Sequence, residues 1–523
     1  MHLPGWLRRT SGWVLYPLLG AAYPVVFLYA QNVHQGISAG EVLAPLVVSV
    51  AVSGATLAIL WAALRDPGRA ALITTLLVAL FYTYGLAWDQ VGSALAGPWV
   101  LVAGWIAIAS LGSAMIVRFG RAARRLTVPL NAFAVVLLAV NLLTVGAFFL
   151  NIRPAAAGGR SGVTAGQQPT GAVTQRDIYW IMLEEYAPQS VLDSAFGYDN
   201  SPFLDALRSR GFYIADRATA NYLKTAPSLD SSRNMVYLDA AALAKRAHGA
   251  DDFGPLYKDL TTPFEVERFL GSQGYRFLYL GMYWAQTASH PDAEINYVYD
   301  KLGSEFIDVL ERATMLRALE GLGPQAPYDW RRNRWNQTSY ELDALDRASQ
   351  LAGPKFVHAQ LALDHEPYVF HADGSFVTDA EDRARTHEAA YVEQLKFTND
   401  TMLAWLDQVL AVPEEQRPII IMQADEGAWP YGYRRNELDF DWTTASPEDL
   451  RTKFGILSAF YVPGMLTPQA AGLYDSITPV NQFRALFNAY FGLDLPLLPD
   501  RNFIWPNQRD IYNLIDVTDR MAP

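Results

Sequence analysis

Residues 177–185 read Asp-Ile-Tyr-Trp-Ile-Met-Leu-Glu-Glu, an apolar run that is closed by two acids. Its side chains are apolar on both faces, as in a sheet strand that helices cover on both sides. Five further short apolar runs follow, and helical stretches separate them. These runs span residues 211–215, 276–280, 355–363, 418–423 and 456–462. The alternation predicts an α/β/α sandwich, in which ligands bind beyond the carboxyl ends of the strands.

Ionisable residues come directly after three of these predicted strands. Glu184 and Glu185 close the first strand, His365 follows the fourth, and Asp425 and Glu426 follow the fifth. Each group alone also fits an ordinary solvated turn. Their shared position after apolar strands favours a common site at one edge of the sheet.

A hydroxyl residue, Thr225, stands just before a predicted helix that opens near Pro227. Backbone N–H groups and the positive end of the helix dipole stabilise an alkoxide or a bound phosphate at such a position. Simple N-capping by threonine is the alternative. Together, Glu184, Thr225, Asp425 and Glu426 would form an all-oxygen cage. Such a cage suits Mn²⁺, Mg²⁺ or Ca²⁺ better than Zn²⁺.

The first 150 residues have a different character. Five long apolar runs lie near residues 12–31, 43–64, 70–87, 96–118 and 127–150, and none carries a charge in its middle. Each is about 18–24 residues long, enough to cross a hydrocarbon core as a helix. Only 18% of the whole chain is charged, which also favours a membrane protein. A buried helical bundle is the alternative to five transmembrane helices.

The loops of this region predict its orientation. Arginines lie before the first run, between the second and third, and between the fourth and fifth, whereas the other two loops contain no Lys or Arg. Positive loops stay cytoplasmic, so we expect a cytoplasmic N-terminus and an extracytoplasmic chain after residue 151. The predicted domains are a membrane domain over 1–151, a linker over 152–175 and an α/β domain over 176–523.

Overall charge and cysteine content exclude several functions. The formal net charge of −12 argues against nucleic acid as a partner. The absence of cysteine excludes disulfides, thiolate metal sites and cysteine nucleophiles. The densest basic and aromatic segment, residues 330–335, reads Trp-Arg-Arg-Asn-Arg-Trp. It fits either a surface that contacts lipid phosphates or an exposed helix face.

The order of the motifs resembles the alkaline phosphatase superfamily, and within it the membrane-bound sulfatase-like hydrolases and transferases. The resemblance covers most of residues 176–495. The segments that resemble family motifs are 177–184, 197–204, 211–212, 221–229, 365–370, 423–427 and 481–492. Five spans followed by an exterior domain also resemble the layout of lipoteichoic acid synthases and phosphoethanolamine transferases.

The resemblance implies roles for particular residues. The transferase relatives use Glu as the first-strand metal ligand and Thr as the nucleophile, which Glu184 and Thr225 match. Formylglycine sulfatases need Arg four residues after the nucleophile, where this chain has Leu229, so that mechanism is excluded. One departure stands out: family members carry His after the motif Asp, and this chain carries Glu426.

The expected function follows from this resemblance. It is a membrane-anchored, metal-dependent phosphoryl-group transferase or hydrolase that acts on phospholipid head groups or envelope glycans through a covalent intermediate on Thr225. His365 would donate a proton to the leaving oxygen or hold a phosphate oxygen. Mn²⁺ or Mg²⁺ is the favoured cofactor, with Zn²⁺ or Ca²⁺ as alternatives, and membrane lipids are the expected partners. The alternative, based on Glu426, is an inactive sulfatase-like binding or assembly subunit.

Overall fold

The computed structural model describes most of the chain and divides it into two compact units. The described residues are 13–33, 37, 39–92, 95, 97–119, 123–150, 164, 175–299, 305–319 and 329–521. The first unit comprises Met1–Ile152 together with Leu302–Trp330, and the second comprises Arg153–Lys301 together with Arg331–Pro523. The predicted linker over 152–175 lies outside the described residues, apart from Thr164 and Gln175.

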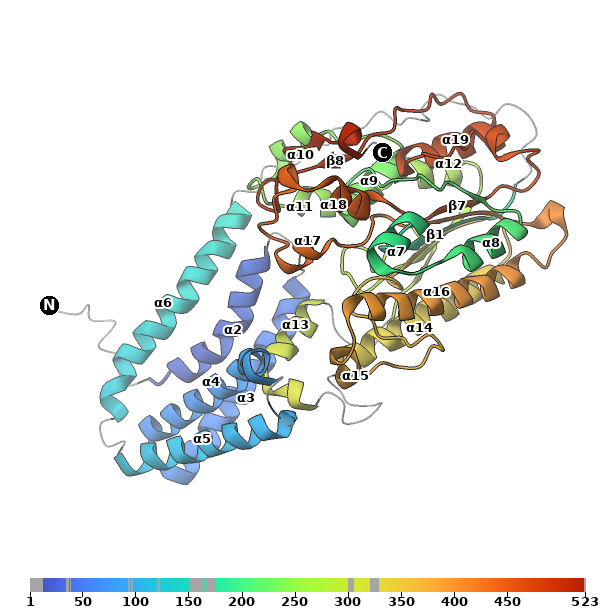
Figure 1. Cartoon of the computed structure of the whole chain (residues 1–523). Helices are drawn as coiled ribbons and strands as arrows, with labels where there is room; N and C mark the ends of the chain where they lie inside the picture. The colour runs from blue at the N-terminus through green and yellow to red at the C-terminus, as the bar shows by residue number, and fades with distance from the viewer. Residues whose placement is uncertain are drawn as a thin grey trace. The chain divides into compact units, whose positions relative to one another are not determined.

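Five consecutive helices form most of the first unit (Figure 1). They are α2 (Tyr16–Asn32), α3 (Ala39–Leu64), α4 (Pro67–Val91), α5 (Pro98–Phe119) and α6 (Ala123–Leu150). Helices α3 to α6 are each long and apolar enough to cross a membrane, as predicted. Helix α2 has 17 residues. At 1.5 Å per residue it is shorter than a hydrocarbon core of about 30 Å, so the predicted count of five spans is not confirmed.

Large apolar side chains are exposed on these helices. Val47 of α3, Ile106 of α5 and Leu143 of α6 are 57%, 58% and 71% exposed. A soluble helical bundle would bury such side chains against its own core, whereas lipid chains cover them in a membrane. The exposure therefore favours membrane spans over the buried bundle.

A segment from later in the chain also belongs to the first unit. It contains α13 (Glu305–Ala313) and a short 3-10 helix, η4 (Met315–Leu319). Phe306 and Leu310 of α13 are buried in a cluster with Val25 and Val42 from α2 and α3. The predicted α/β domain over 176–523 included this segment, whereas its contacts group it with the first unit.

Helix α4 receives this segment at a glycine. A Cβ atom at Gly85 would lie only 2.1 Å from the carbonyl oxygen of Arg312, so the backbones of α4 and α13 approach closely there. One turn along α4, Asp89 forms an ion pair with Arg317 at 2.6 Å. The absence of a side chain at Gly85 and the ion pair between Asp89 and Arg317 together determine where the segment packs on α4.

A seven-stranded sheet forms the centre of the second unit, which confirms the α/β fold. Its strand order is β2-β7-β6-β1-β5-β3-β4. Strand β1 pairs in parallel with both β5 and β6, whereas β7 is antiparallel to β6 and to β2. The strands span Ile178–Leu183 (β1), Tyr213–Ile214 (β2), Arg276–Leu280 (β3), Ile295–Tyr297 (β4), Lys355–Leu361 (β5), Ile419–Gln423 (β6) and Ser458–Tyr461 (β7). All six predicted strands are present, and β4 was not predicted.

Helices cover both faces of this sheet (Figure 1). On β1, the ring of Tyr179 packs edge-on against Trp405, and the ring of Trp180 packs edge-on against Phe483. Because neighbouring side chains of a strand point to opposite faces, Trp405 and Phe483 lie on opposite sides of the sheet. The helices that bear them are α16 (His387–Val409) and α19 (Pro479–Phe491). The predicted three-layer sandwich is therefore confirmed.

The remaining helices and a small second sheet complete the unit. The helices are α7 (Gln189–Phe196), α8 (Ser201–Ser209), α9 (Thr225–Asn234), α10 (Ala240–Arg246), α11 (Gly254–Leu260), α12 (Glu265–Ser272), α14 (Trp330–Ser349), α15 (Asp379–Arg383), α17 (Tyr431–Arg435) and α18 (Pro447–Phe454). A two-stranded sheet joins β8 (Phe503–Ile504) to β9 (Ile515–Asp516).

Both sequence interpretations of the basic segment 330–335 are wrong. This segment opens α14, but Arg331 and Arg334 are only 4% and 8% exposed. Arg332 and Arg334 lie over the rings of Phe376 and Tyr283, at 3.5 and 3.4 Å from the ring centroids. Arg331 and Arg334 therefore belong to the interior, and the half-buried Arg332 packs on an aromatic ring, so the arginines form neither a lipid-binding surface nor an exposed face.

Candidate active site

Three parallel strands bring the predicted acidic residues to one edge of the sheet. In the register of the sheet, Leu183 lies opposite Leu361, and Met182 lies opposite Gln423. The residues that follow these strand ends therefore emerge side by side. Glu184, Glu185, Asp425 and Glu426 are all buried there. The structure thus brings together acids that are far apart in the sequence.

Burial and mutual repulsion disfavour the charged forms of Glu184, Glu185 and Asp425. Burial and the charge of Asp425 raise the pKa of Glu184 well above its usual value. Burial also raises the pKa of Glu185, although Lys453 opposes that shift. Burial and the charge of Glu426 raise the pKa of Asp425 to about 6. A bound cation would relieve this strain, because it would stabilise the ionised carboxylates.

Thr225 is the first residue of α9, as the sequence analysis expected. It is half-buried, and its hydroxyl lies close enough to Asp425 to lower the pKa of that carboxyl. Neither oxygen of Asp425 nevertheless has a hydrogen bond of ordinary geometry. Buried carboxylate oxygens without partners are unusual in proteins and point to a missing ion or ligand.

The donor set fits a divalent cation with three protein oxygens. Asp425 offers two unpartnered oxygens, Thr225 offers a hydroxyl, and Glu184 is buried beside them with a hydrogen bond from Gln360. Within the part of the chain that the structure describes, no three His, Asp or Glu side chains form a group that could hold a metal alone. Carboxylate and hydroxyl oxygens suit Mn²⁺ or Mg²⁺.

The fourth predicted ligand, Glu426, already has a cationic partner. The ammonium of Lys453 lies 3.1 Å from Oε2 of Glu426, and the indole of Trp429 donates to Oε1 at 3.3 Å. Lys453 is fully buried, which lowers its pKa, while Glu426 acts in the opposite direction. The sequence analysis missed Lys453 because nothing local marks it: it lies in an ordinary amphipathic helix, α18.

A second lysine stands next to the predicted nucleophile. Lys224 directly precedes Thr225, forms an ion pair with Glu437 at 2.7 Å and lies 4.2 Å from the centre of the Trp429 ring. Burial lowers the pKa of Lys224, but Tyr433 and Glu437 outweigh this effect and raise it well above its usual value. Lys224 therefore supplies a stable positive charge beside Thr225.

His365 reaches the acidic cluster through Glu185. Its Nε2 atom lies 3.4 Å from Oε1 of Glu185, the second of the two acids that close the first strand. Glu185 has a φ angle of 59°, in the left-handed region that costs a non-glycine residue about 1–2 kcal/mol. Tyr391 stabilises this turn, because its hydroxyl donates to the Glu185 carbonyl at 2.9 Å and accepts from the Ala187 amide at 3.0 Å.

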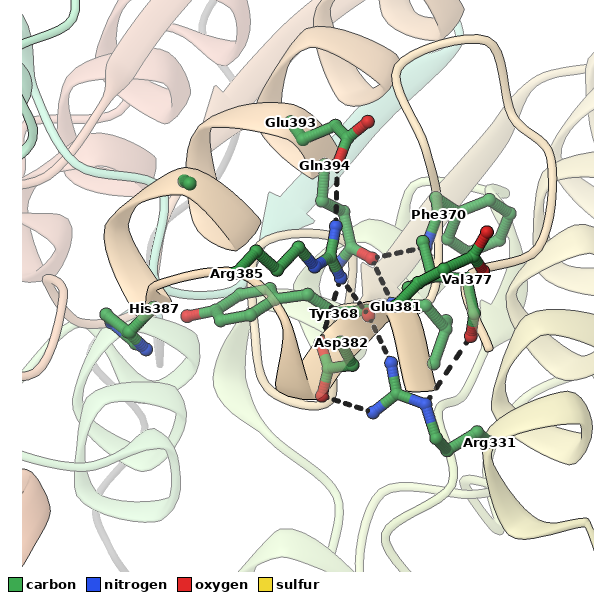
Figure 2. Close-up of polar contacts among 12 residues, drawn as sticks. Arg331, Tyr368, Phe370, Val377, Glu381, Asp382, Arg385, His387, Glu393 and Gln394 are labelled. Atoms are coloured by element: carbon green, nitrogen blue, oxygen red, sulfur yellow. Dashed lines mark hydrogen bonds and ion pairs between the residues drawn. The ribbon is translucent and has the colours of Figure 1, made fainter. Parts of the chain in front are cut away.

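Two buried arginines fix the loop that follows His365 (Figure 2). Arg331 donates to the carbonyl of Tyr368 at 2.6 Å and to Asp382 at 2.9 Å. Arg385 donates to the same Tyr368 carbonyl at 2.8 Å and also binds Glu393. We call this group, Arg331, Arg385, Tyr368, Asp382 and Glu393, the arginine latch.

A glutamine of α16 completes the attachment of this loop. Oε1 of Gln394 accepts hydrogen bonds from the amides of Val369 and Phe370 at 2.7 and 3.0 Å, and its Nε2 donates to the carbonyl of Leu363 (Figure 2). Gln394 thus binds the chain on both sides of His365. Together with the arginine latch, it gives the histidine loop a defined conformation.

One solved structure that the chain matches is a protein in the alkaline phosphatase superfamily from Vibrio parahaemolyticus, with a TM-score of 0.39 and 14% identity over 64% of this chain and 74% of that one. Another is the C-terminal periplasmic domain of EcEptC from Escherichia coli, with a TM-score of 0.42 and 11% identity over 67% of this chain and 94% of that one. The lipoteichoic acid synthase LtaP from Listeria monocytogenes has a TM-score of 0.38 and 14% identity, over 66% and 83%. The soluble domain of lipooligosaccharide phosphoethanolamine transferase A from Neisseria meningitidis has a TM-score of 0.36 and 11% identity, over 62% and 89%.

No family model and no curated protein matches the chain. At these identities and TM-scores, the activity has to be argued from the chain's own site residues.

Proposed function

We propose that this chain is a membrane-anchored, metal-dependent phosphoryl-group transferase or hydrolase. Its substrates are phospholipid head groups or envelope glycans, and the reaction passes through a covalent intermediate on Thr225. The N-terminus is cytoplasmic, the chain spans the membrane several times, and the α/β domain is extracytoplasmic. The membrane unit keeps the site close to lipid substrates, which raises their effective concentration.

One observation carries this proposal: the Thr225 hydroxyl stands at the start of α9, beside a buried Asp425 whose oxygens have no hydrogen-bond partners. The helix N-terminus favours negative charge on the hydroxyl oxygen and on a bound phosphate. A divalent cation held by Glu184, Asp425 and Thr225 would lower the pKa of this hydroxyl. Lys224, the residue before Thr225, adds positive charge for the phosphate oxygens.

Thr225 and His365 each carry one part of the first step of the reaction. Oγ1 of Thr225 forms a bond to phosphorus and releases its proton to water, while the bond from phosphorus to the leaving oxygen breaks. His365, which lies beside Glu185, donates the proton that the leaving oxygen takes up. An acceptor hydroxyl or water then displaces Thr225 from phosphorus and gives its proton to His365, while Oγ1 of Thr225 regains a proton from water. The identity of that acceptor separates a transferase from a hydrolase.

The test is a search for the covalent intermediate. The purified protein is incubated with Mn²⁺ or Mg²⁺ and with candidate phospholipids, and peptides containing Thr225 are analysed by mass spectrometry. We expect a phosphorus-containing adduct in the wild type, a weaker adduct in Thr225→Ser and no adduct in Thr225→Ala. A wild type without any adduct, under conditions in which a related transferase reacts, would contradict the proposal.

A second candidate function keeps the fold without the chemistry. Glu426, a predicted metal ligand, forms an ion pair with Lys453 instead. This pairing favours an inactive binding or assembly subunit. Such a subunit does not need the Thr225 hydroxyl. Thr225→Ala would then leave function in cells intact, whereas the enzyme would lose it.

A further inference from the structure

The acids of the site fall into two groups with different partners. Glu426 forms an ion pair with Lys453 at 3.1 Å, and both side chains are buried, at 3% and 0% exposure. Asp425, the residue before it, has two buried oxygens without hydrogen bonds. Breaking a buried ion pair leaves an uncompensated charge in the interior, so Glu426 is strongly held by Lys453. Neither oxygen of Asp425 is held in this way.

The backbone places Lys453 at this position. The amide of Gly427 donates to the carbonyl of Lys453 at 2.8 Å, and the Lys453 ammonium donates back to the Gly427 carbonyl at 3.3 Å. A Cβ atom on Gly427 would lie 2.4 Å from the carbonyl oxygen of Thr452 and 2.5 Å from that of Gly455. The glycine therefore allows the turn after β6 to lie directly against the end of α18. Lys453 is fixed beside Glu426 by main-chain contacts, not only by charge.

We propose that Lys453 is a positioning residue that keeps Glu426 out of the metal coordination, so that the site holds one divalent cation on Glu184, Asp425 and Thr225. Glu426 and Lys453 neutralise each other, which leaves the carboxylates of Glu184 and Asp425 and the Thr225 hydroxyl as donors for the cation. The inference rests on the proposed function, because it concerns the cation of the same site. Glu426, which stands where the resembled family has His, then serves as the partner of Lys453 and not as a metal ligand.

The test is the binding of Mn²⁺ alone, measured by calorimetric titration of the full chain in detergent. The decisive variant is Lys453→Met with Glu426→Gln, because it removes both partners and keeps the net charge of the wild type. We expect the wild-type chain to bind one Mn²⁺. The Kd of the double variant should lie within about threefold of the wild-type Kd. Lys453→Met alone releases Glu426 and should bind Mn²⁺ at least about tenfold more tightly, whereas Asp425→Asn should bind at least about tenfold more weakly.

Three results would overturn the inference. A double variant that binds Mn²⁺ about tenfold more weakly would show that Glu426 is itself a ligand. An unchanged Kd for Lys453→Met would show that Lys453 does not restrain Glu426, and a wild type that binds no Mn²⁺ would remove the site altogether. If Lys453→Met does not fold, the charge-matched double variant still decides the question.

Mn²⁺ binding needs no turnover, so the two proposals fail separately. The expected binding pattern without an adduct on Thr225 would refute the enzymatic function and leave the cation site standing. An adduct on Thr225 together with weak Mn²⁺ binding by the double variant would support the enzymatic function and refute the role of Lys453.

Discussion

A buried carboxyl group with a raised pKa makes the folded state sensitive to pH. The pKa of Asp425 is raised to about 6 by burial and by Glu426, from an unfolded value of about 4. Below the unfolded pKa the group is protonated in both states and costs the fold nothing. As the pH rises from about 4 to about 6, the group ionises in the unfolded chain before it does so in the folded protein, so stability falls over this range. Without metal, this group therefore lowers the stability of the protein at neutral pH.

Asp425→Asn should stabilise the metal-free protein at pH 7.5. The amide removes the cost of a buried charge, and we expect a gain on the order of 2 kcal/mol in the free energy of unfolding, which disappears below about pH 4. Thermal unfolding with a chelator, measured across pH 4–8, checks this. Asp407→Asn is the control of opposite sign, because the hydrogen bonds from Arg210 lower the pKa of Asp407. A variant less stable than the wild type at pH 7.5 would contradict the prediction.

At the residue scale, position relative to a strand was the useful signal. The placement of Glu184, Asp425 and Thr225 could be predicted because each stands at the end of a strand or the start of a helix, whereas their roles stay a prediction. Lys453 could not, since its role depends on a backbone contact with Gly427 that no local pattern reveals. The pairing of His365 with Glu185 likewise depends on the register of two strands.

At the scale of elements, apolar runs predicted the strands, because a strand covered on both faces needs apolar side chains in both directions. Strand β4 was missed because it has three residues and none of them is buried. The arginines of α14 were misjudged for a different reason. An arginine on a helix is usually exposed, and the carbonyl and carboxylate that hold Arg331 in the interior come from residues 368 and 382.

Arg331→Met should loosen the histidine loop. The variant removes one of the two arginines that bind Asp382 and the Tyr368 carbonyl, while Arg385 still binds both, so we expect a loss of about 1–3 kcal/mol in the free energy of unfolding. Amide hydrogen exchange in residues 366–378 should also accelerate more than elsewhere in the second unit.

The matched control is Arg383→Gln, which removes an exposed ion pair with Asp379 on the neighbouring helix α15. An exposed pair of this kind contributes at most about 0.5 kcal/mol, so little change is expected. Equal effects of the two substitutions would show that the arginine latch does not hold the loop.

At the scale of the whole molecule, the division into an apolar first part and an α/β second part could be predicted from composition and periodicity. The place of residues 302–330 could not. Helix α13 is short and amphipathic, like many helices of soluble domains, and its apolar partners Val25 and Val42 lie far earlier in the chain. By its contacts the first unit is thus built from two separate stretches of sequence.

The chain lacks cysteine, so this packing can be tested with an introduced pair. Cysteines that replace Asp89 and Arg317, which form an ion pair at 2.6 Å, should react with a short bismaleimide to give one internally cross-linked species on a gel. Gly85→Leu in the same background should abolish the cross-link, because its side chain would collide with the backbone at Arg312. Gly104→Leu, in α5 with open space around it, is the control. A cross-link that survives Gly85→Leu would contradict this packing.

The assignment of residues 302–330 to the first unit has a practical consequence for anyone who wishes to produce the second unit alone. Cutting the gene after the predicted linker removes Val25 and Val42 but leaves Phe306 and Leu310 in the product, with their apolar surface facing water. Such a fragment should aggregate or require detergent even though it contains no transmembrane helix. Replacing residues 302–330 with a short glycine and serine bridge should yield a fragment that stays monodisperse in buffer.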